Sequence, residues 1–148
     1  MLTDAERDSL RRAAIDVAKN AHAPYSKFRV GAAVLGARAT YRGANVENAS
    51  YGLSLCAETV ALAKANSDGR LRDVVEVAVI GGMIAANGLT GTDPVSPCGR
   101  CRQVLNEAAQ LGGRDLVIHC AAAEGGAVAS HKLSDLLPHA FGPSDLGL

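Results

Sequence analysis

Two of the four cysteines stand three residues apart, in the segment Cys98-Gly99-Arg100-Cys101. On a helix, residues three apart share a face, so both sulfurs would project from the first turn in the same direction. The helix dipole and the free N–H groups at that end favour thiolates over thiols. Taken alone, the pair is compatible with metal binding, with redox chemistry or with two inert cysteines.

A third cysteine opens the segment Cys56-Ala57-Glu58, which should begin a buried helix. Three thiolates brought together form a site with three protein ligands and one open position, which is typical of catalytic rather than structural zinc. The open position takes a water, whose pKa zinc lowers from about 15.7 towards 7. We therefore predict one Zn²⁺ per chain on Cys56, Cys98 and Cys101. Glu58, two residues after a ligand, is placed to take that water's proton and deliver it elsewhere.

The neighbours of Glu58 are apolar, and they include Leu55, Val60 and Ala61. A buried glutamate without a role would be costly, so this setting favours a functional residue over a solvated one.

The remaining candidates carry weaker signals. Cys120 and His119 lie in an apolar run and are expected to be buried strand residues. No partner spacing indicates a metal site at the other histidines, His22, His131 and His139.

The elements before the metal motifs can be placed from capping and periodicity. Thr3 begins a capping box, and apolar residues at helical spacing follow until Pro24. Residues 28–35 and 38–46 read as an antiparallel hairpin. Residues 55–65 should form a buried helix, and residues 74–80 an interior strand closed by Gly81-Gly82.

The second half of the chain continues the alternation of helices and strands. Residues 87–94 form a polar loop, after which Ser96 caps a helix with Pro97 in its first position, running to about residue 110. Strands are expected at 115–121 and 127–130, and a last helical turn or two at 133–137. The order predicts an α/β protein whose mixed sheet is covered by helices on both faces.

Composition limits the class of partner. The 148 residues suit one domain, and 15 basic residues balance 15 acidic ones. A protein that binds many phosphates normally has a basic excess, and five aromatic residues are a poor stock for stacking bases. We expect a small neutral ligand and no nucleic acid.

Apolar stretches are far shorter than the ~20 residues of a membrane span. The charged N-terminus has no apolar signal region, so we expect no membrane association and a cytoplasmic location.

Together these segments resemble the short-chain, homotetrameric cytidine deaminases, here with a three-cysteine zinc site. The resemblance covers nearly the whole chain, as one domain over residues 1–148. It implies a three-layer α/β/α fold with a mixed sheet of about five strands, and a homotetramer. The matching segments are 28–33 (FRVGAA), 45–51 (NVENASY), 56–58 (CAE), 96–103 (SPCGRCRQ) and 137–141 (LPHAF).

The resemblance also implies the reaction. Zinc-bound hydroxide attacks C4 of cytidine, and of 2′-deoxycytidine, while Glu58 carries protons to ring N3 and to the departing amine. The products are uridine or deoxyuridine and ammonia, as in pyrimidine salvage.

Roles for the substrate-binding positions follow from the same resemblance. Asn45 and Glu47 would bind the ribose 3′-hydroxyl, although turn chemistry is an alternative for Asn45. The Ala57 N–H would bind the 2-oxo group and the Ser96 carbonyl the departing amine. Phe28 would pack on the base. Phe141 would reach the base from a neighbouring subunit or simply pack the tail. Tyr51 would line the sugar side, either of its own site or across a subunit boundary.

Three thiolates leave the zinc centre with a net charge of −1, which should weaken its Lewis acidity. Many members of the family place an arginine directly after the glutamate, where this chain has Thr59. We expect Arg100 or Arg102, which flank Cys101, to supply part of the compensation.

Other functions remain to be weighed against this one. A related deaminase could act on another aminopyrimidine nucleoside, such as a nucleoside antibiotic, and a polynucleotide deaminase is disfavoured by charge. A thiol–disulfide protein would use Cys98 and Cys101 but leave Cys56 and Glu58 unexplained. A non-catalytic zinc module would need a fourth protein ligand, and none is evident.

Overall fold

The computed structural model describes residues 2–148 and contains one mixed sheet of six strands. The order along the sheet is β2 (Thr40–Ala44), β1 (Phe28–Leu35), β3 (Glu76–Ala85), β5 (Val117–Ala122) and β6 (Val128–Lys132). The short β4 (Gly88–Thr90) pairs with the end of β3. Only β3 and β5 run parallel, and the other pairs are antiparallel. The expected mixed sheet is confirmed, with β4 as an addition to the five longer strands.

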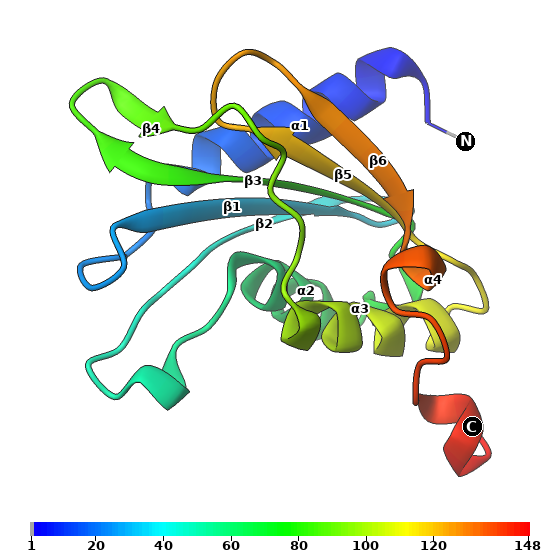
Figure 1. Cartoon of the computed structure of the whole chain (residues 1–148). Coiled ribbons are helices and arrows are strands. Elements are labelled where there is room, and N and C mark those ends of the chain that lie inside the picture. Colours follow the sequence, from blue (N-terminus) through cyan, green and yellow to red (C-terminus); the bar gives the residue numbers. More distant parts are fainter. Residues whose placement is uncertain (1) are drawn as a thin grey trace.

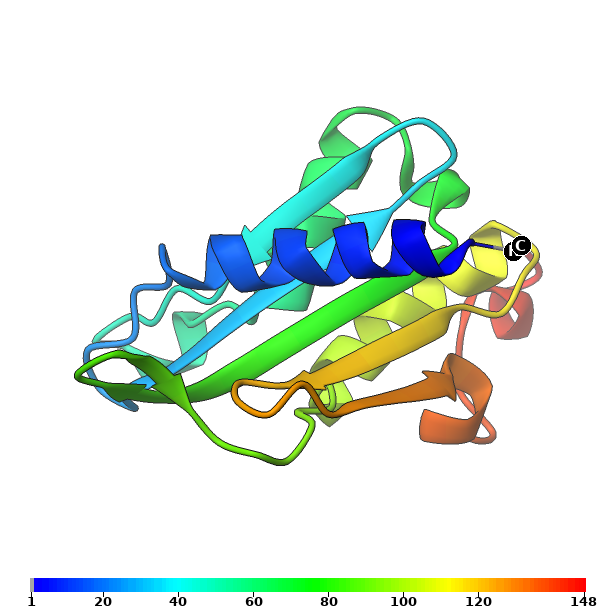
Figure 2. The ribbon, with the colours of Figure 1, turned by 90° about the horizontal axis from the view of Figure 1, so that it is seen from above.

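Helices cover both faces of this sheet, so the predicted α/β/α layering is confirmed. Figure 1 shows α1 (Asp4–Ala18) above the strands, with α2 (Ala57–Ser67) and α3 (Gly99–Leu111) below them. Figure 2, seen from above, shows α1 crossing over the strands. Of the described α-helices, α4 (Leu133–Leu136) is the shortest, and no described helix is long and apolar enough to cross a membrane.

The strands alternate their side chains between two separate cores. Val77 and Val79 of β3 face α2 and α3, whereas Ala78 and Ile80 face α1. Two glycines bring the helices unusually close to the sheet. A Cβ on Gly31 would lie 2.0 Å from the Ala14 carbonyl of α1, and one on Gly43 would lie 2.3 Å from the Ala57 carbonyl of α2.

Two helix ends differ from the prediction because irregular segments pair with each other. α1 ends at Ala18 rather than near Pro24, since His22 leaves the helix to bond with the backbone on either side of Val46. α2 begins at Ala57 rather than at residue 55, because Leu55 exchanges two backbone hydrogen bonds with Val46.

Gly81-Gly82 does not close β3, which continues to Ala85. A Cβ on Gly82 would lie 2.5 Å from the Thr90 carbonyl, so the glycine admits the backbone of β4 instead of ending the strand. The segment predicted as a loop at 87–94 accordingly begins with β4.

The start of α3 was also predicted too early. Its N-cap is Cys98, with extended backbone angles, and its first residue is Gly99. Ser96 and Pro97 therefore precede the helix, and the cap residue is Cys98 rather than a serine.

Candidate metal centre and adjoining pocket

Three cysteine sulfurs meet where α2 and α3 begin. Cys56 is the N-cap of α2, Cys98 is the N-cap of α3, and Cys101 lies in the first turn of α3. All three sulfurs lie within 4.8 Å of one another, and those of Cys56 and Cys98 are 3.8 Å apart. Tetrahedral zinc with Zn–S bonds of about 2.3 Å requires sulfurs about 3.8 Å apart. The sulfur geometry and the donor type therefore both fit one zinc ion per chain.

Electrostatics at the cysteines favour a shared negative charge. Hydrogen bonding from Cys101, and then from Cys98, outweighs burial and lowers the pKa of Cys56 to about 6. The same bond to Cys56, together with burial, raises the pKa of Cys101. Cys56 and Cys98 are the N-cap residues of α2 and α3, and negative charge is favoured at that end of a helix.

Glu58 occupies the first turn of α2 and is buried, with only 4% of its surface exposed. One carboxylate oxygen lies 3.5 Å from the Cys101 sulfur. Burial raises the pKa of Glu58, which brings this carboxyl closer to the range where it can both accept and return a proton at neutral pH.

A cavity of about 280 Å³ opens beside the sulfurs. Its walls come from β1, from the segment after β2, from the start of α2 and from the loop that leads into α3. The cavity brings together most of the residues predicted from the sequence, namely Phe28, Asn45, Glu47, Cys56, Ala57, Glu58, Ser96 and Cys98.

The two residues predicted to bind ribose already have partners in the chain. Asn45 accepts a hydrogen bond from the Val30 N–H at 2.8 Å and donates one to the Phe28 carbonyl at 3.0 Å. Glu47 accepts from the Ser26 hydroxyl and from the N–H groups of Tyr25 and Ser26, and these bonds, led by that of the hydroxyl, lower its pKa. Both side chains are therefore fixed at the cavity wall.

Tyr51 and Phe141 lie outside that cavity. Tyr51 lines an adjoining depression of about 350 Å³ together with Glu47, and its ring centre is 5.6 Å from that of Tyr25. It is 73% exposed. Phe141 is 61% exposed and lines neither cavity, while its carbonyl accepts hydrogen bonds from Gln103 and Asn106 of α3.

The predicted compensating arginines bond to carbonyl groups. Arg100 donates to the Ser54 carbonyl, and Arg102 donates to those of Pro97 and Leu136. Within residues 2–148, no arginine donates a hydrogen bond to a ligand sulfur. Arg100 does help to lower the pKa of Cys56 through its charge.

One polar contact to the sulfurs was not predicted from the sequence. The Thr59 hydroxyl lies 3.6 Å from the Cys101 sulfur. The available signal was its position directly after Glu58, although sequence alone does not show that so short a side chain reaches a ligand.

Cys120 and His119 are buried strand residues, as expected. Burial raises the pKa of Cys120, which is outside the sulfur cluster. His119 places Nε2 2.5 Å from a Glu76 carboxylate oxygen and Nδ1 2.7 Å from the Ser130 hydroxyl.

Comparison with known proteins gives one consistent family. A family model described as the cytidine and deoxycytidylate deaminase zinc-binding region matches residues 5–120. The cytidine deaminase of Halalkalibacterium halodurans is 43% identical over 142 residues, covering 95% of this chain and 98% of the relative. That of Mycobacterium tuberculosis is 41% identical over 149 residues, with 98% and 96% covered.

Solved structures give the same result. The crystal structure of the Burkholderia pseudomallei cytidine deaminase superposes with a TM-score of 0.79 at 39% identity, covering 95% of this chain and all of the other. The Mycobacterium tuberculosis enzyme superposes with a TM-score of 0.71 at 38% identity, covering 94% of this chain and 99% of the other.

Proposed function

The chain belongs to the cytidine and deoxycytidylate deaminase family, and from this we propose that it hydrolyses cytidine, and 2′-deoxycytidine, to uridine or deoxyuridine and ammonia. The observation that carries the proposal is a cluster of three sulfurs, two of whose cysteines, Cys56 and Cys98, line one cavity together with the buried Glu58. Relatives named as cytidine deaminases favour cytidine over a nucleoside antibiotic as the substrate. We assign residues 1–148 to a single deaminase domain built on one sheet.

Cys56, Cys98 and Cys101 would hold the zinc, which when bound supplies hydroxide at neutral pH by lowering the pKa of a water. Glu58 takes the proton released by that water and gives it to ring N3, which makes C4 electrophilic. After addition at C4, Glu58 passes the hydroxyl proton to the amino group, which leaves as ammonia. One water is consumed, and Glu58 returns to its starting protonation state.

The cavity wall supplies the remaining contacts. The free N–H of Ala57, at the start of α2, is a donor for the 2-oxo group, and the Ser96 carbonyl is an acceptor for the amine. Phe28 packs on the base. Asn45 keeps one amide hydrogen and one lone pair beyond its bonds to β1, and Glu47 keeps acceptor capacity, so both can bind the ribose 3′-hydroxyl.

A homotetramer would complete this site. Tyr51 and Phe141 are exposed aromatic rings that contribute little to this chain's own core, which supports roles at a neighbouring copy's site. Sedimentation equilibrium should give a mass four times that of the chain. A monomer that retains full activity would contradict the proposal.

Arg100 is proposed to stabilise the thiolates through its charge, and Arg102 by holding the Pro97 carbonyl, next to Cys98. Substituting each by Gln should weaken zinc retention. Unchanged zinc affinity in both variants would remove them from this role.

We propose that the protein acts in pyrimidine salvage in the cytoplasm, a reducing compartment in which disulfides between its cysteines are disfavoured. Cell fractionation tests this location.

The deciding experiment is a spectrophotometric assay of the zinc-loaded protein with cytidine, 2′-deoxycytidine, cytosine, adenosine and a nucleoside antibiotic. Turnover of the first two alone is expected. Turnover of the antibiotic alone would replace the proposed substrate. A zinc content near zero per chain, with disulfide-exchange activity, would instead support a redox function.

A further inference from the structure

The turn before β1 contains a serine, Ser26, that has no part in the reaction proposed above. Its hydroxyl donates a hydrogen bond to the Glu47 carboxylate. The same oxygen accepts a hydrogen bond from the Phe28 N–H at 3.0 Å, which is possible because a hydroxyl can donate and accept at once. One side chain is therefore bonded both to the predicted ribose-binding carboxylate and to the residue predicted to pack on the base.

The Glu47 carboxylate is held at both of its oxygens. The N–H groups of Tyr25 and Ser26 donate to one oxygen, at 3.0 and 3.2 Å, whereas the Ser26 hydroxyl donates to the other. Bonds to a single oxygen would leave the carboxylate free to rotate about it, so the hydroxyl bond fixes the plane of the group. The plane determines which lone pairs of Glu47 face the catalytic cavity that this residue lines.

The backbone of the turn is itself fixed at Lys27. Its φ of 59° lies in the left-handed region, which residues other than glycine seldom adopt. The Lys27 N–H donates to the Ala23 carbonyl at 3.1 Å, and the Lys27 carbonyl accepts from the Ile84 N–H of β3 at 2.8 Å. The Ser26 hydroxyl is therefore presented to Glu47 and Phe28 by a turn that is anchored on the sheet.

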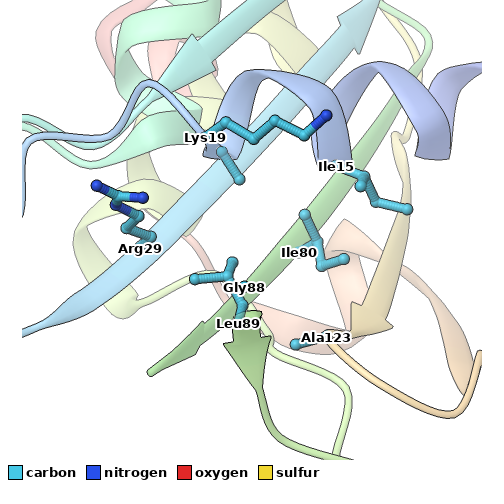
Figure 3. Close-up of a pocket in the computed structure, with 8 residues that line it drawn as sticks. Ile15, Lys19, Arg29, Ile80, Gly88, Leu89 and Ala123 are labelled. Carbon is cyan, nitrogen blue, oxygen red and sulfur yellow. The ribbon is translucent and has the colours of Figure 1, made fainter. Parts of the chain in front are cut away.

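The bond to the Phe28 N–H also bears on which side chains of β1 face the substrate. Side chains alternate along the strand, so Phe28 and Val30 line the catalytic cavity. Arg29, between them, borders a separate cavity of about 200 Å³ between α1 and the sheet (Figure 3). A slip of one residue would exchange these faces, and the bond from Phe28 to Ser26 opposes such a slip at the first residue of β1.

We propose that Ser26 is a positioning residue that aims the Glu47 carboxylate at the ribose 3′-hydroxyl, and that it thereby sets the preference for substrates carrying this hydroxyl. The inference rests on the proposed function, in which Glu47 binds that group. Ser26 lines the adjoining depression together with Glu47, whereas Glu47 and Phe28 line the catalytic cavity. Ser26 therefore acts through Glu47 and not by contact with the nucleoside.

Steady-state kinetics of the zinc-loaded protein with cytidine and 3′-deoxycytidine test the proposal, because the two substrates differ only in the group that Glu47 would bind. Ser26→Ala should raise KM for cytidine at least about fivefold and change kcat less than about twofold, since the sugar contact is made equally in the ground state and the transition state. The preference for cytidine, measured as the ratio of the two kcat/KM values, should fall at least about fivefold.

Three further variants separate positioning from a merely structural role. Ser26→Thr keeps the hydroxyl and should restore the preference. Adding Ser26→Ala to Glu47→Gln should lower the preference no further than Glu47→Gln alone, because the serine acts through the carboxylate. Ser67→Ala is the matched control, since it removes an exposed hydroxyl that bonds to the Ala63 carbonyl within α2, and it should behave as the unchanged protein does.

Three results would each overturn the inference. These are an unchanged preference in Ser26→Ala, an equal loss of kcat/KM for both substrates, and a failure of Ser26→Thr to restore the preference. Should Ser26→Ala fail to fold, Ser26→Cys, which keeps the shape but donates poorly, takes its place. Absence of cytidine turnover by the unchanged protein would contradict the proposed function as well, whereas normal turnover with any of the three results contradicts the inference alone.

Discussion

The hydroxyl of Thr59 lies 3.6 Å from the sulfur of Cys101, the most buried of the three ligand cysteines. The hydrogen bond with Cys56, burial and the charge of Glu58 together raise the pKa of that cysteine, and the Thr59 hydroxyl acts in the opposite direction. If the three cysteines hold zinc as thiolates, the Thr59 hydroxyl would donate to the Cys101 sulfur and would withdraw electron density from the centre. The group next to the Cys101 sulfur is therefore a neutral hydroxyl, whereas Arg100 and Arg102 donate their hydrogen bonds to backbone carbonyls.

Replacing Thr59 by Val should weaken zinc binding about tenfold, because the shape is kept while the donor to sulfur is lost. Competition with a chromogenic chelator measures this affinity directly. Thr59→Ser keeps the hydroxyl and is the matched control, with affinity near that of the unchanged protein. Equal zinc affinity in all three proteins would show that the contact has no electronic role.

Glu58→Gln should lower kcat for cytidine by about 100-fold to 10,000-fold, because the amide cannot carry a proton. Zinc content should stay near one per chain, since Glu58 is not among the three converging ligands. Metal analysis and steady-state kinetics on the same preparation provide the measurement. Substantial deamination by the zinc-loaded variant would show that another group moves the protons.

The bonds to Glu47 should depend on pH in a defined direction. Its folded pKa lies below the ordinary 4.5, so their stabilising effect is complete above 4.5 and is lost as pH falls through the folded pKa. The amide NMR signals of Tyr25 and Ser26 should shift with a midpoint below 4.5, and not at all in Glu47→Gln. A midpoint above 4.5 would contradict this account.

The Glu76–His119 pair should matter for stability rather than for chemistry. His119→Ala leaves the buried Glu76 carboxyl with Arg7, at 3.9 Å, as its nearest charged partner, and should lower the free energy of unfolding by about 3 kcal/mol. Ser130→Ala removes the hydroxyl that contacts His119 Nδ1 but leaves the Glu76–His119 contact in place, so it should cost only about 1 kcal/mol. Denaturant unfolding of both variants makes the comparison, and equal losses would exclude the proposed role of the pair.

The sequence indicates which cysteines come together, but it does not indicate where every helix begins and ends. Cys56, Cys98 and Cys101 could be predicted because residue type and helix-start position are local properties. Pairing of His22 and Leu55 with the segment around Val46 has no local signal, and for this reason α1 and α2 were predicted to be longer at those ends.

A glycine in a strand can mark the end of the strand or admit the close approach of another backbone, and sequence alone does not distinguish these two roles. Gly82 was read as a strand end, whereas the structure uses it for the approach of the β4 backbone. The contact of Thr59 with Cys101 depends on how closely α2 and α3 pack, which a single sequence does not give.

The absence of a side chain at Gly43 has a consequence for the position of Cys56. The first turn of α2 rests on this glycine, so its lack of a Cβ sets how far Cys56 stands from the two sulfurs on α3. A methyl group at residue 43 would lie 2.3 Å from the Ala57 carbonyl and would push this end of α2 outward. A strand residue outside the sulfur cluster and its cavity thus fixes the position of the helix start that carries Cys56.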